Sequence, residues 1–236
     1  MKFLASALLG VSLTVAQTAN AVEVTGGSIN LYYSGFTDET DVSNFGIEGS
    51  MEIGFTQAFS AQLDLSHNDF GATNIGVGGY GAHAIWHLDP ATSFGAYYGR
   101  EDFEGADLDN YGVEAGYETA AWEFEGYLGR LDDGGNKSTA FGVSGRYLFQ
   151  NDLGLTGYYD DAGLGDEVDI SRVGIKLDRD VAPNLNLFLE VGSGRLEASG
   201  ASISEPYLGI GGKLVFGAER GATFEQRGLA RILPGL

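Results

Sequence analysis

Apolar and polar residues alternate along nearly the whole chain, and the segment FGIEGSMEIGFT at residues 45–56 shows the pattern clearly. Large apolar residues take every second position there, and Glu48, Ser50 and Glu52 stand between them. A period of two is that of a β-strand, whose successive side chains point to opposite faces. The pattern recurs in about twelve segments of about 8–12 residues, so the sequence predicts an all-β protein.

The connections between the predicted strands alternate in length. Short connections follow even-numbered strands (HLDPAT, ETAAWE and FQNDL), and longer ones follow odd-numbered strands (EDFEGADLD, LDDGGNKST, DDAGLGDE and SGRLEASGASISEP). Tilted strands of this length cross a bilayer, and outer-membrane barrels combine short periplasmic turns with longer external loops. The predicted fold is therefore a transmembrane antiparallel up-and-down β-barrel of about 12 strands.

Aromatic residues gather near both ends of the predicted strands, as in the two interfacial girdles of membrane barrels. A secreted β-sandwich or a lipocalin-like barrel would also alternate, with the apolar face as its core. Connection lengths and aromatic positions favour the membrane barrel over these alternatives. The aromatic residues are Phe55, Trp86, Phe94, Tyr117, Trp122, Tyr147, Phe149 and Phe216 at the short-turn ends, and Phe45, Tyr98, Tyr111, Phe141 and Tyr159 at the long-loop ends.

Three regions follow from the pattern. Residues 1–21 combine a basic start, an apolar run and the small residues Ala19 and Ala21, which predicts an export signal removed after Ala21. Residues 22–216 form the predicted barrel. Residues 217–236 do not alternate, and we assign them to a periplasmic C-terminal tail that docks under the barrel, enters the lumen as a partial plug or remains disordered.

The segments SINLYYSGF, YGVEAGYE and YLGIGGKLVF, together with the export signal, resemble those of Gram-negative porins and porin-like outer-membrane proteins. The resemblance covers almost the whole chain after the signal, as a pattern more than as a sequence signature. It implies an outer-membrane location. General porins are longer, with more strands, and they end at the terminal aromatic residue, whereas this chain continues for 20 residues after Phe216.

In such a barrel the polar positions line the lumen, and two groups of charges are expected there. Acidic residues lie on the earlier strands: Glu48, Glu52, Asp64, Glu114, Glu118, Glu123 and Glu125. Basic residues lie on the later strands: Arg146, Arg172, Lys176 and Lys213. The acidic excess favours cations in an open channel. Alternatively, these charges pair across a closed lumen as structural ion networks.

The sequence shows only weak signs of nucleic-acid, metal or lipopolysaccharide binding. The net charge of −20 disfavours nucleic acid as a partner. His83 and His87 lie about 13 Å apart along a strand, too far for one metal ion, and no metal or cofactor is expected. Arg100 and Arg130 have outward parity at the external ends of their strands, where guanidinium groups bind lipopolysaccharide phosphates or simply reach solvent.

The sequence thus predicts a porin-like channel for passive diffusion of small hydrophilic solutes and ions, with a mild cation preference and no enzymatic activity. One alternative is a non-conducting structural or surface-interaction barrel. Another is an outer-membrane lipid hydrolase, which would use His67. Trimers are common among porins, but an outward apolar face serves lipid and a neighbouring subunit equally well, so the sequence does not reveal the oligomeric state.

Overall fold

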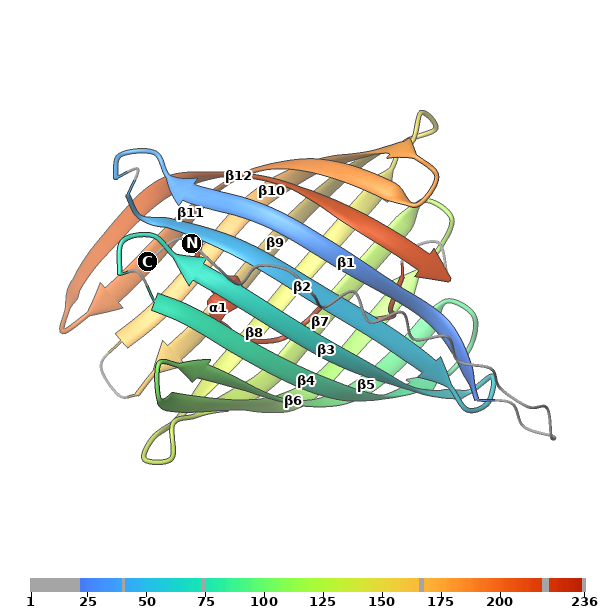
Figure 1. Ribbon diagram of the computed structural model, residues 1–236, viewed down its shortest axis with the longest axis horizontal. Helices are drawn as coiled ribbons and strands as arrows, with labels where there is room; N and C mark the ends of the chain where they lie inside the picture. Colours follow the sequence, from blue (N-terminus) through green and yellow to red (C-terminus); the bar gives the residue numbers. More distant parts are fainter. Residues whose placement is uncertain (1–21, 40, 74, 166–167, 218–220, 235–236) are drawn as a thin grey trace, which may run out of the picture.

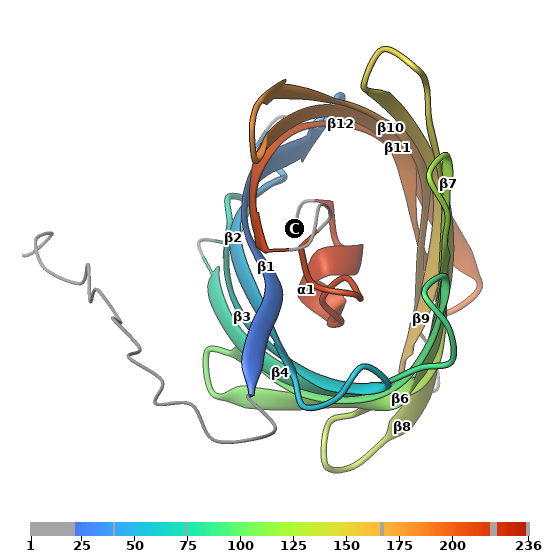
Figure 2. The same cartoon turned by 90° about the vertical axis from the view of Figure 1, so that its right-hand side faces the viewer.

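The chain forms one closed antiparallel β-barrel, in agreement with the predicted fold (Figures 1 and 2). The computed structural model describes residues 22–39, 41–73, 75–165, 168–217 and 221–234, so the predicted export signal, residues 1–21, lies outside the described residues. In the described ranges there are twelve strands and one short helix. They are β1 (Glu23–Phe36), β2 (Ser43–Gly54), β3 (Phe59–Phe70), β4 (Ile75–His87), β5 (Thr92–Phe103), β6 (Ala106–Glu118), β7 (Trp122–Asp132), β8 (Lys137–Leu148), β9 (Leu153–Leu164), β10 (Val168–Ala182), β11 (Leu185–Ala198), β12 (Ala201–Gly217) and α1 (Leu229–Ile232).

Each strand pairs with its neighbours in sequence, and β1 closes the barrel by pairing with β12. Tyr33 lies opposite Ile210 and Ile29 opposite Leu214, so the first and last strands match apolar positions on the outer face. Closure leaves no free sheet edge, because every strand has two partners. No helix in the described part of the chain is long and apolar enough to cross a bilayer.

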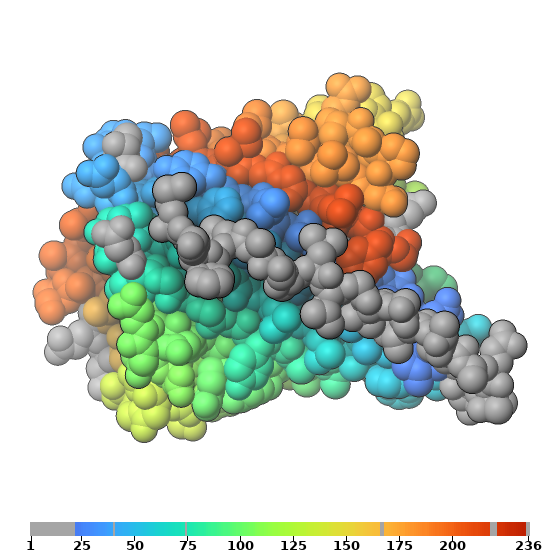
Figure 3. All heavy atoms as spheres, in the orientation of Figure 1, coloured from blue at the N-terminus to red at the C-terminus, as the bar shows by residue number. Residues whose placement is uncertain are grey.

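The two faces of the barrel wall differ as the alternation predicts. In β2 the side chains of Glu48 and Glu52 point inward and are 6% and 4% exposed, whereas Ile47 is 42% exposed on the outer face. Large apolar residues such as Leu65 and Val113 are exposed on the outside. Figure 3 shows one side of this outer surface, on which neighbouring strands pack side by side. This inversion, polar within and apolar without, is the arrangement expected of a barrel whose outer surface contacts lipid.

The connections differ from the expected long loops. Residues 101–109 (EDFEGADLD) continue β5 and β6 almost to the turn, which consists of Glu104 and Gly105 alone. Both residues have positive φ angles, 53° and 99°, the geometry that two-residue hairpin turns require. Ser199 and Gly200 make a similar turn with φ angles of 50° and 80°. The polar segments after odd-numbered strands are therefore mostly strand extensions.

We call the barrel end with the turns after odd-numbered strands the odd-turn end, and the opposite end the even-turn end. β12 finishes at the even-turn end, and α1 lies inside the barrel. Figure 2 shows α1 inside the ring of strands. Thr223, which precedes α1 in the chain, contacts Glu52 near the even-turn end, and Leu233 contacts Asn44 near the odd-turn end. Residues 221–234, which we call the tail, therefore run through the interior from the even-turn end towards the odd-turn end.

The wall leaves little space at Gly112 in β6. A Cβ atom there would overlap the backbone carbonyl oxygen of Leu128 on the adjacent strand β7. We expect Gly112→Ala to destabilise the barrel by about 1–3 kcal/mol, because backbone atoms must shift. Gly157→Ala is the matched control, since a Cβ at Gly157 meets nothing within 4 Å, and its effect should stay within about 0.5 kcal/mol. Urea unfolding in detergent measures both, and equal effects would contradict the close approach at Gly112.

Candidate functional site

The predicted acidic wall exists on the inner face of β2–β7. Glu48, Glu52, Asp64 and Glu114 all point into the lumen and are 4–6% exposed. Antiparallel pairing places them near one another, since Ser50 lies opposite Asp64 and Glu52 lies opposite Gln62. A buried carboxylate is costly unless it has a hydrogen-bonded or charged partner, so each of these groups requires one.

His83 in β4 supplies part of the compensation. Its Nε2 atom lies 2.8 Å from an Asp64 oxygen, and its Nδ1 atom lies 2.5 Å from a Glu114 oxygen. An ionised carboxylate accepts hydrogen bonds only, so this geometry requires a proton on both ring nitrogens. The His83 ring is therefore a buried imidazolium between two carboxylates.

His87, four residues after His83 on the same strand, has different contacts. His87 Nε2 lies 2.9 Å from the Ser60 hydroxyl, and His87 Nδ1 lies 2.9 Å from the Ser93 hydroxyl. A carboxylate oxygen of Glu52 lies 3.4 Å from His87 Nε2. Both histidines thus face the lumen, each in its own set of hydrogen bonds.

The predicted basic residues lie on the inner face of β8, β10 and β12, opposite the acidic wall. Arg146 bridges Glu123 at 2.8 Å and Asp178 at 2.6 Å. Arg172 pairs with Asp160 at 2.8 Å. These two arginines are therefore already partnered by carboxylates of the barrel itself.

The two predicted lysines differ from the arginines. The ammonium group of Lys176 lies 5.3 Å from the centre of the Phe188 ring, and Lys213 lies 3.2 Å from Glu225 of the tail. Glu225 also pairs with Arg231 at 2.6 Å. Lys213, with Arg231, holds the pKa of the Glu225 carboxyl well below its usual range, so this carboxylate stays ionised at neutral pH.

The tail supplies partners to the acidic wall, and it lies inside the lumen, which is one of the three positions that the sequence analysis left open for residues 217–236. The Thr223 N–H donates to Glu52 at 2.8 Å. Gln62 makes two hydrogen bonds with the Phe224 backbone, accepting from the N–H at 3.1 Å and donating to the carbonyl at 2.8 Å. The Phe224 ring is 2% exposed and stacks on the His83 ring at 6.3 Å. The tail lies inside the lumen because its polar groups satisfy buried groups of the wall.

Arg227 makes the strongest of these contacts. Its guanidinium group lies 2.8 Å from Glu114 and 2.6 Å from Glu125. It also stacks over the ring of Tyr127 at 4.5 Å and lies 5.9 Å from the ring centre of Tyr97. Charge-assisted hydrogen bonds to two carboxylates, with aromatic faces on the side, suit a guanidinium group rather than an ammonium group.

Of the predicted acidic residues, Glu123 and Glu125 are half-buried, and so is Glu118. The first two contact arginines, as described. Glu118 lies opposite Glu123 in the β6–β7 pair, at the even-turn end of the lumen. The structure thus brings Glu52, Asp64, Glu114 and Glu125 together around the tail and leaves Glu118 and Glu123 nearer the even-turn end.

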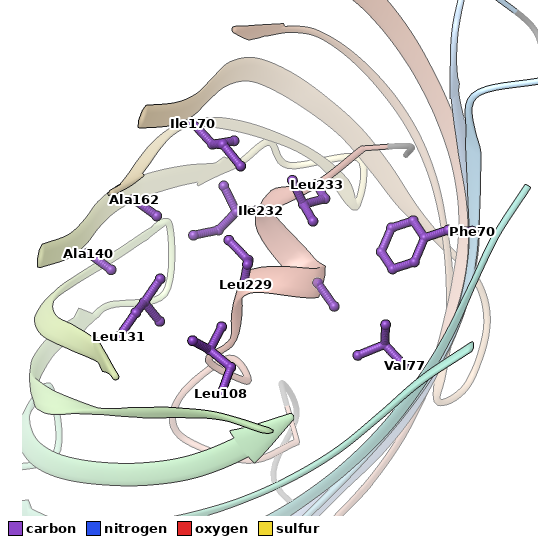
Figure 4. Packing of buried hydrophobic residues seen from close by; sticks show 11 residues of the cluster. Phe70, Val77, Leu108, Leu131, Ala140, Ala162, Ile170, Leu229, Ile232 and Leu233 are labelled. Carbon is purple, nitrogen blue, oxygen red and sulfur yellow. The ribbon is translucent and has the colours of Figure 1, made fainter. Parts of the chain in front are cut away.

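The tail ends in an apolar layer near the odd-turn end. Leu229, Ile232 and Leu233 are 3–6% exposed. Figure 4 shows their side chains between opposite walls of the barrel, with Phe70 and Val77 on one side and residues of β6–β10 on the other. The inner face at this level is apolar, in contrast to the charged middle of the lumen. The wall residues of this layer are Phe70, Val77, Leu108, Leu131, Ala140, Ala162 and Ile170.

Glu101 in β5 is a lumen residue that the sequence analysis missed. Its carboxylate accepts hydrogen bonds from the N–H groups of Leu229 at 2.6 Å and Ala230 at 3.0 Å, at the start of α1. A carboxylate at this position stabilises a helix N-terminus. Asn44 holds the other end by donating to the carbonyl groups of Ala230 and Leu233. The alternation along β5 would have identified Glu101: because Arg100 points outward, the next residue in the strand must point into the lumen.

The two arginines predicted on the outer face differ in whether their charge is already paired within the barrel. Arg100 forms a bidentate pair with Asp109, with bonds of 2.6 and 2.9 Å, and contacts Asp107 at 3.4 Å. Arg130 is exposed on the outer face of β7, between Tyr111 and Thr139 of the adjacent strands. His67, also on the outer face, lies 3.2 Å from Asp69.

A cavity of about 200 Å³ remains beside the tail, bounded mainly by β7–β12. In the part of the chain that the structure describes, its lining contains equal numbers of basic and acidic side chains. The basic ones are Arg146, Arg172, Lys176, Lys213, Arg227 and Arg231. The acidic ones are Glu48, Glu123, Glu125, Asp160, Glu190 and Glu225. With the tail in place, the remaining space is therefore polar and close to electrically balanced.

No family model and no curated protein matches the chain. Several solved structures have a similar fold. KdgM porin superposes with a TM-score of 0.62 at 12% identity, covering 80% of this chain and 99% of that chain. An outer-membrane channel from Pseudomonas putida F1 gives 0.60 at 13% identity, covering 86% and 100%. NanC porin gives 0.58 at 8% identity, covering 80% and 98%. The chain thus has the closed β-barrel fold found in outer-membrane porins.

The contact between Glu101 and α1 gives a stability prediction. In Glu101→Gln the amide replaces a charged acceptor of two N–H groups, and we expect the free energy of unfolding to fall by about 1.5–3 kcal/mol. Glu104→Gln is the matched control, because Glu104 is exposed in the adjacent turn, and its effect should stay within about 0.5 kcal/mol. Urea unfolding followed by circular dichroism measures both, and a Glu101→Gln variant as stable as the control would contradict this role.

Proposed function

We propose that the protein is a porin-like channel of the Gram-negative outer membrane for passive diffusion of small hydrophilic solutes and ions. The observation that carries the proposal is the closed barrel with an apolar outside and a charged lumen that retains a polar cavity beside the tail. A hydrated path through such a lumen would lower the barrier for polar solutes and would need no cofactor and no catalysis.

The fold comparisons support this function by analogy, because one barrel fold can carry several functions. The similar structures are porins and channels, and one of them is described as KdgM porin in complex with disordered oligogalacturonate, a hydrophilic solute. Export through the signal at residues 1–21, with removal after Ala21, would deliver the chain to the outer membrane.

A mild cation preference belongs to the proposal. The chain carries a net charge of −20, and acidic groups line one half of the lumen. The preference is mild because the cavity beside the docked tail has equal numbers of acidic and basic groups. Solutes that pass through it meet carboxylates together with ammonium and guanidinium groups.

A non-conducting structural barrel is the second candidate. The observation that favours it is the apolar layer that Leu229, Ile232 and Leu233 form across the lumen. On the outer surface, Arg130 is the better candidate for a lipopolysaccharide phosphate, because Arg100 already pairs with Asp107 and Asp109. For a lipid hydrolase, His67 has the orienting partner Asp69, but no serine contact to His67 is found among the described residues.

The cation preference can be tested on the lumen charges. In the double variant Glu48→Gln and Glu190→Gln, two carboxylates of the cavity lining become neutral, so the reversal potential in a potassium chloride gradient should move towards zero. Glu197→Gln, on the exposed outer wall, is the control and should leave the reversal potential unchanged. Planar-bilayer recording measures the native protein, the double variant and the control.

The channel proposal itself fails if neither the native chain nor a variant with a loosened tail, Arg227→Gln, conducts at any salt concentration.

The membrane location predicts a depth-dependent cost for charge on the outer face. Val113→Arg places a guanidinium group in the middle of the apolar belt, where it should destabilise the barrel by about 2–4 kcal/mol. Thr139→Arg lies beyond Phe141 towards the odd-turn end and should cost about 0–1 kcal/mol. Denaturant unfolding from lipid vesicles compares the two variants, and equal costs would argue against a lipid boundary at this height.

A further inference from the structure

We propose that the acidic side of the lumen is a peptide-binding site, and that the tail is its own releasable ligand, whose departure widens the channel. The peptide that fits has an aromatic residue, an arginine three positions later and a short apolar end, as in GATFEQRGLARILP at residues 221–234. The docking part of this inference stands by itself, whereas the widening of a channel rests on the proposed function.

The tail contacts the barrel in the way a ligand does. Among the described residues, every hydrogen bond between tail and wall uses a side chain on one partner, and none extends the sheet. Each barrel strand already has two strand partners. The tail can therefore leave without breaking a backbone hydrogen bond of the barrel.

The tail also depends on the wall for its conformation. Helix α1 has four residues, its N-cap residue Gly228 offers no side-chain cap, and its first N–H groups bond to Glu101 of the wall. A helix this short is unstable alone in water, because nucleation costs more than one turn returns. The segment is thus expected to be ordered when docked and unfolded when released, like a peptide that folds on binding.

Two levels of the lumen divide the binding between them. At the middle level, Gln62 holds the backbone of Phe224. Glu114 and Glu125 bind the guanidinium group of Arg227 and so select an arginine at this position. At the odd-turn level, the burial of Leu229 and Ile232 against the apolar wall supplies hydrophobic stabilisation. The tail extends from the even-turn end, where β12 finishes, with its polar part first, so a free peptide is tested from that side.

Release would change the charge of the path as well as its width. The tail takes Arg227 and Arg231 with it and uncovers Glu52, Glu101 and Glu114 of the wall. The emptied lumen would then be wider and more acidic than the cavity beside the docked tail. The docked state remains favoured, because release exposes the apolar layer and leaves buried carboxylates without partners.

The first test follows docking without any need for conduction. The chain contains no cysteine, so Ala230→Cys gives a single thiol at a position that is 1% exposed in the docked tail. We expect a water-soluble maleimide to label it at least about 100-fold more slowly than a thiol at the exposed position of Gln150. Adding Arg227→Gln should speed labelling of the buried thiol by about tenfold or more. Adding Arg195→Gln, on the exposed outer wall, should leave it unchanged.

The second test records conductance of the full chain and of the full Arg227→Gln chain in planar bilayers. The inference predicts more frequent wide openings in the variant, and closure again when the free peptide of residues 221–234 is added on the even-turn side. Unchanged labelling in Arg227→Gln would overturn the docking site. Faster labelling with unchanged conductance would overturn the tail as a gate but not the channel, whereas no conductance in either protein would overturn the proposed function. Heat-modifiable gel mobility confirms that each variant is folded.

Discussion

The buried carboxylates of the lumen need partners, and this requirement governs the interior of the barrel. Closure of the sheet sends every second residue inward, and on β2–β7 many of those residues are acidic. Arg227, held between Glu114 and Glu125, supplies the central positive charge, and His83 supplies a second one beside Asp64. A buried charge that keeps no partner costs several kcal/mol, so the acidic wall and the tail depend on each other.

The lumen changes character along its length, and the tail changes in the same order. Its first part is polar and contacts the charged middle of the barrel, whereas its second part is apolar and packs near the odd-turn end. The tail is thus amphipathic along the chain rather than around a helix. This arrangement fixes its direction, since a reversed tail would place Leu229 among carboxylates and Arg227 in the apolar layer.

The strands and their faces could be predicted from the sequence because a period of two has a direct geometric meaning. Glu48, Glu52, Asp64 and Glu114 were assigned inward by parity, and the structure places them there. Turn lengths were predicted less well, because polar residues beyond the lipid belt resemble loop residues even where they continue a strand. Glu101 was missed for that reason, since its segment EDFEGADLD was interpreted as a loop.

The position of the tail was hard to predict from the sequence for a different reason. Nothing in the local pattern of residues 217–236 says which surface will cover its apolar residues, because the covering residues come from β3–β10, far away in sequence. The charges offered the one indication: an acidic lumen and an arginine-containing tail are complementary.

That complementarity also changes what the separation of acidic and basic residues on the wall implies. A wall with acidic and basic halves implies a transverse field across an empty lumen, but the docked tail brings its own arginines to the acidic half and largely cancels that field. The selectivity of the barrel is therefore a property of the wall and the tail together.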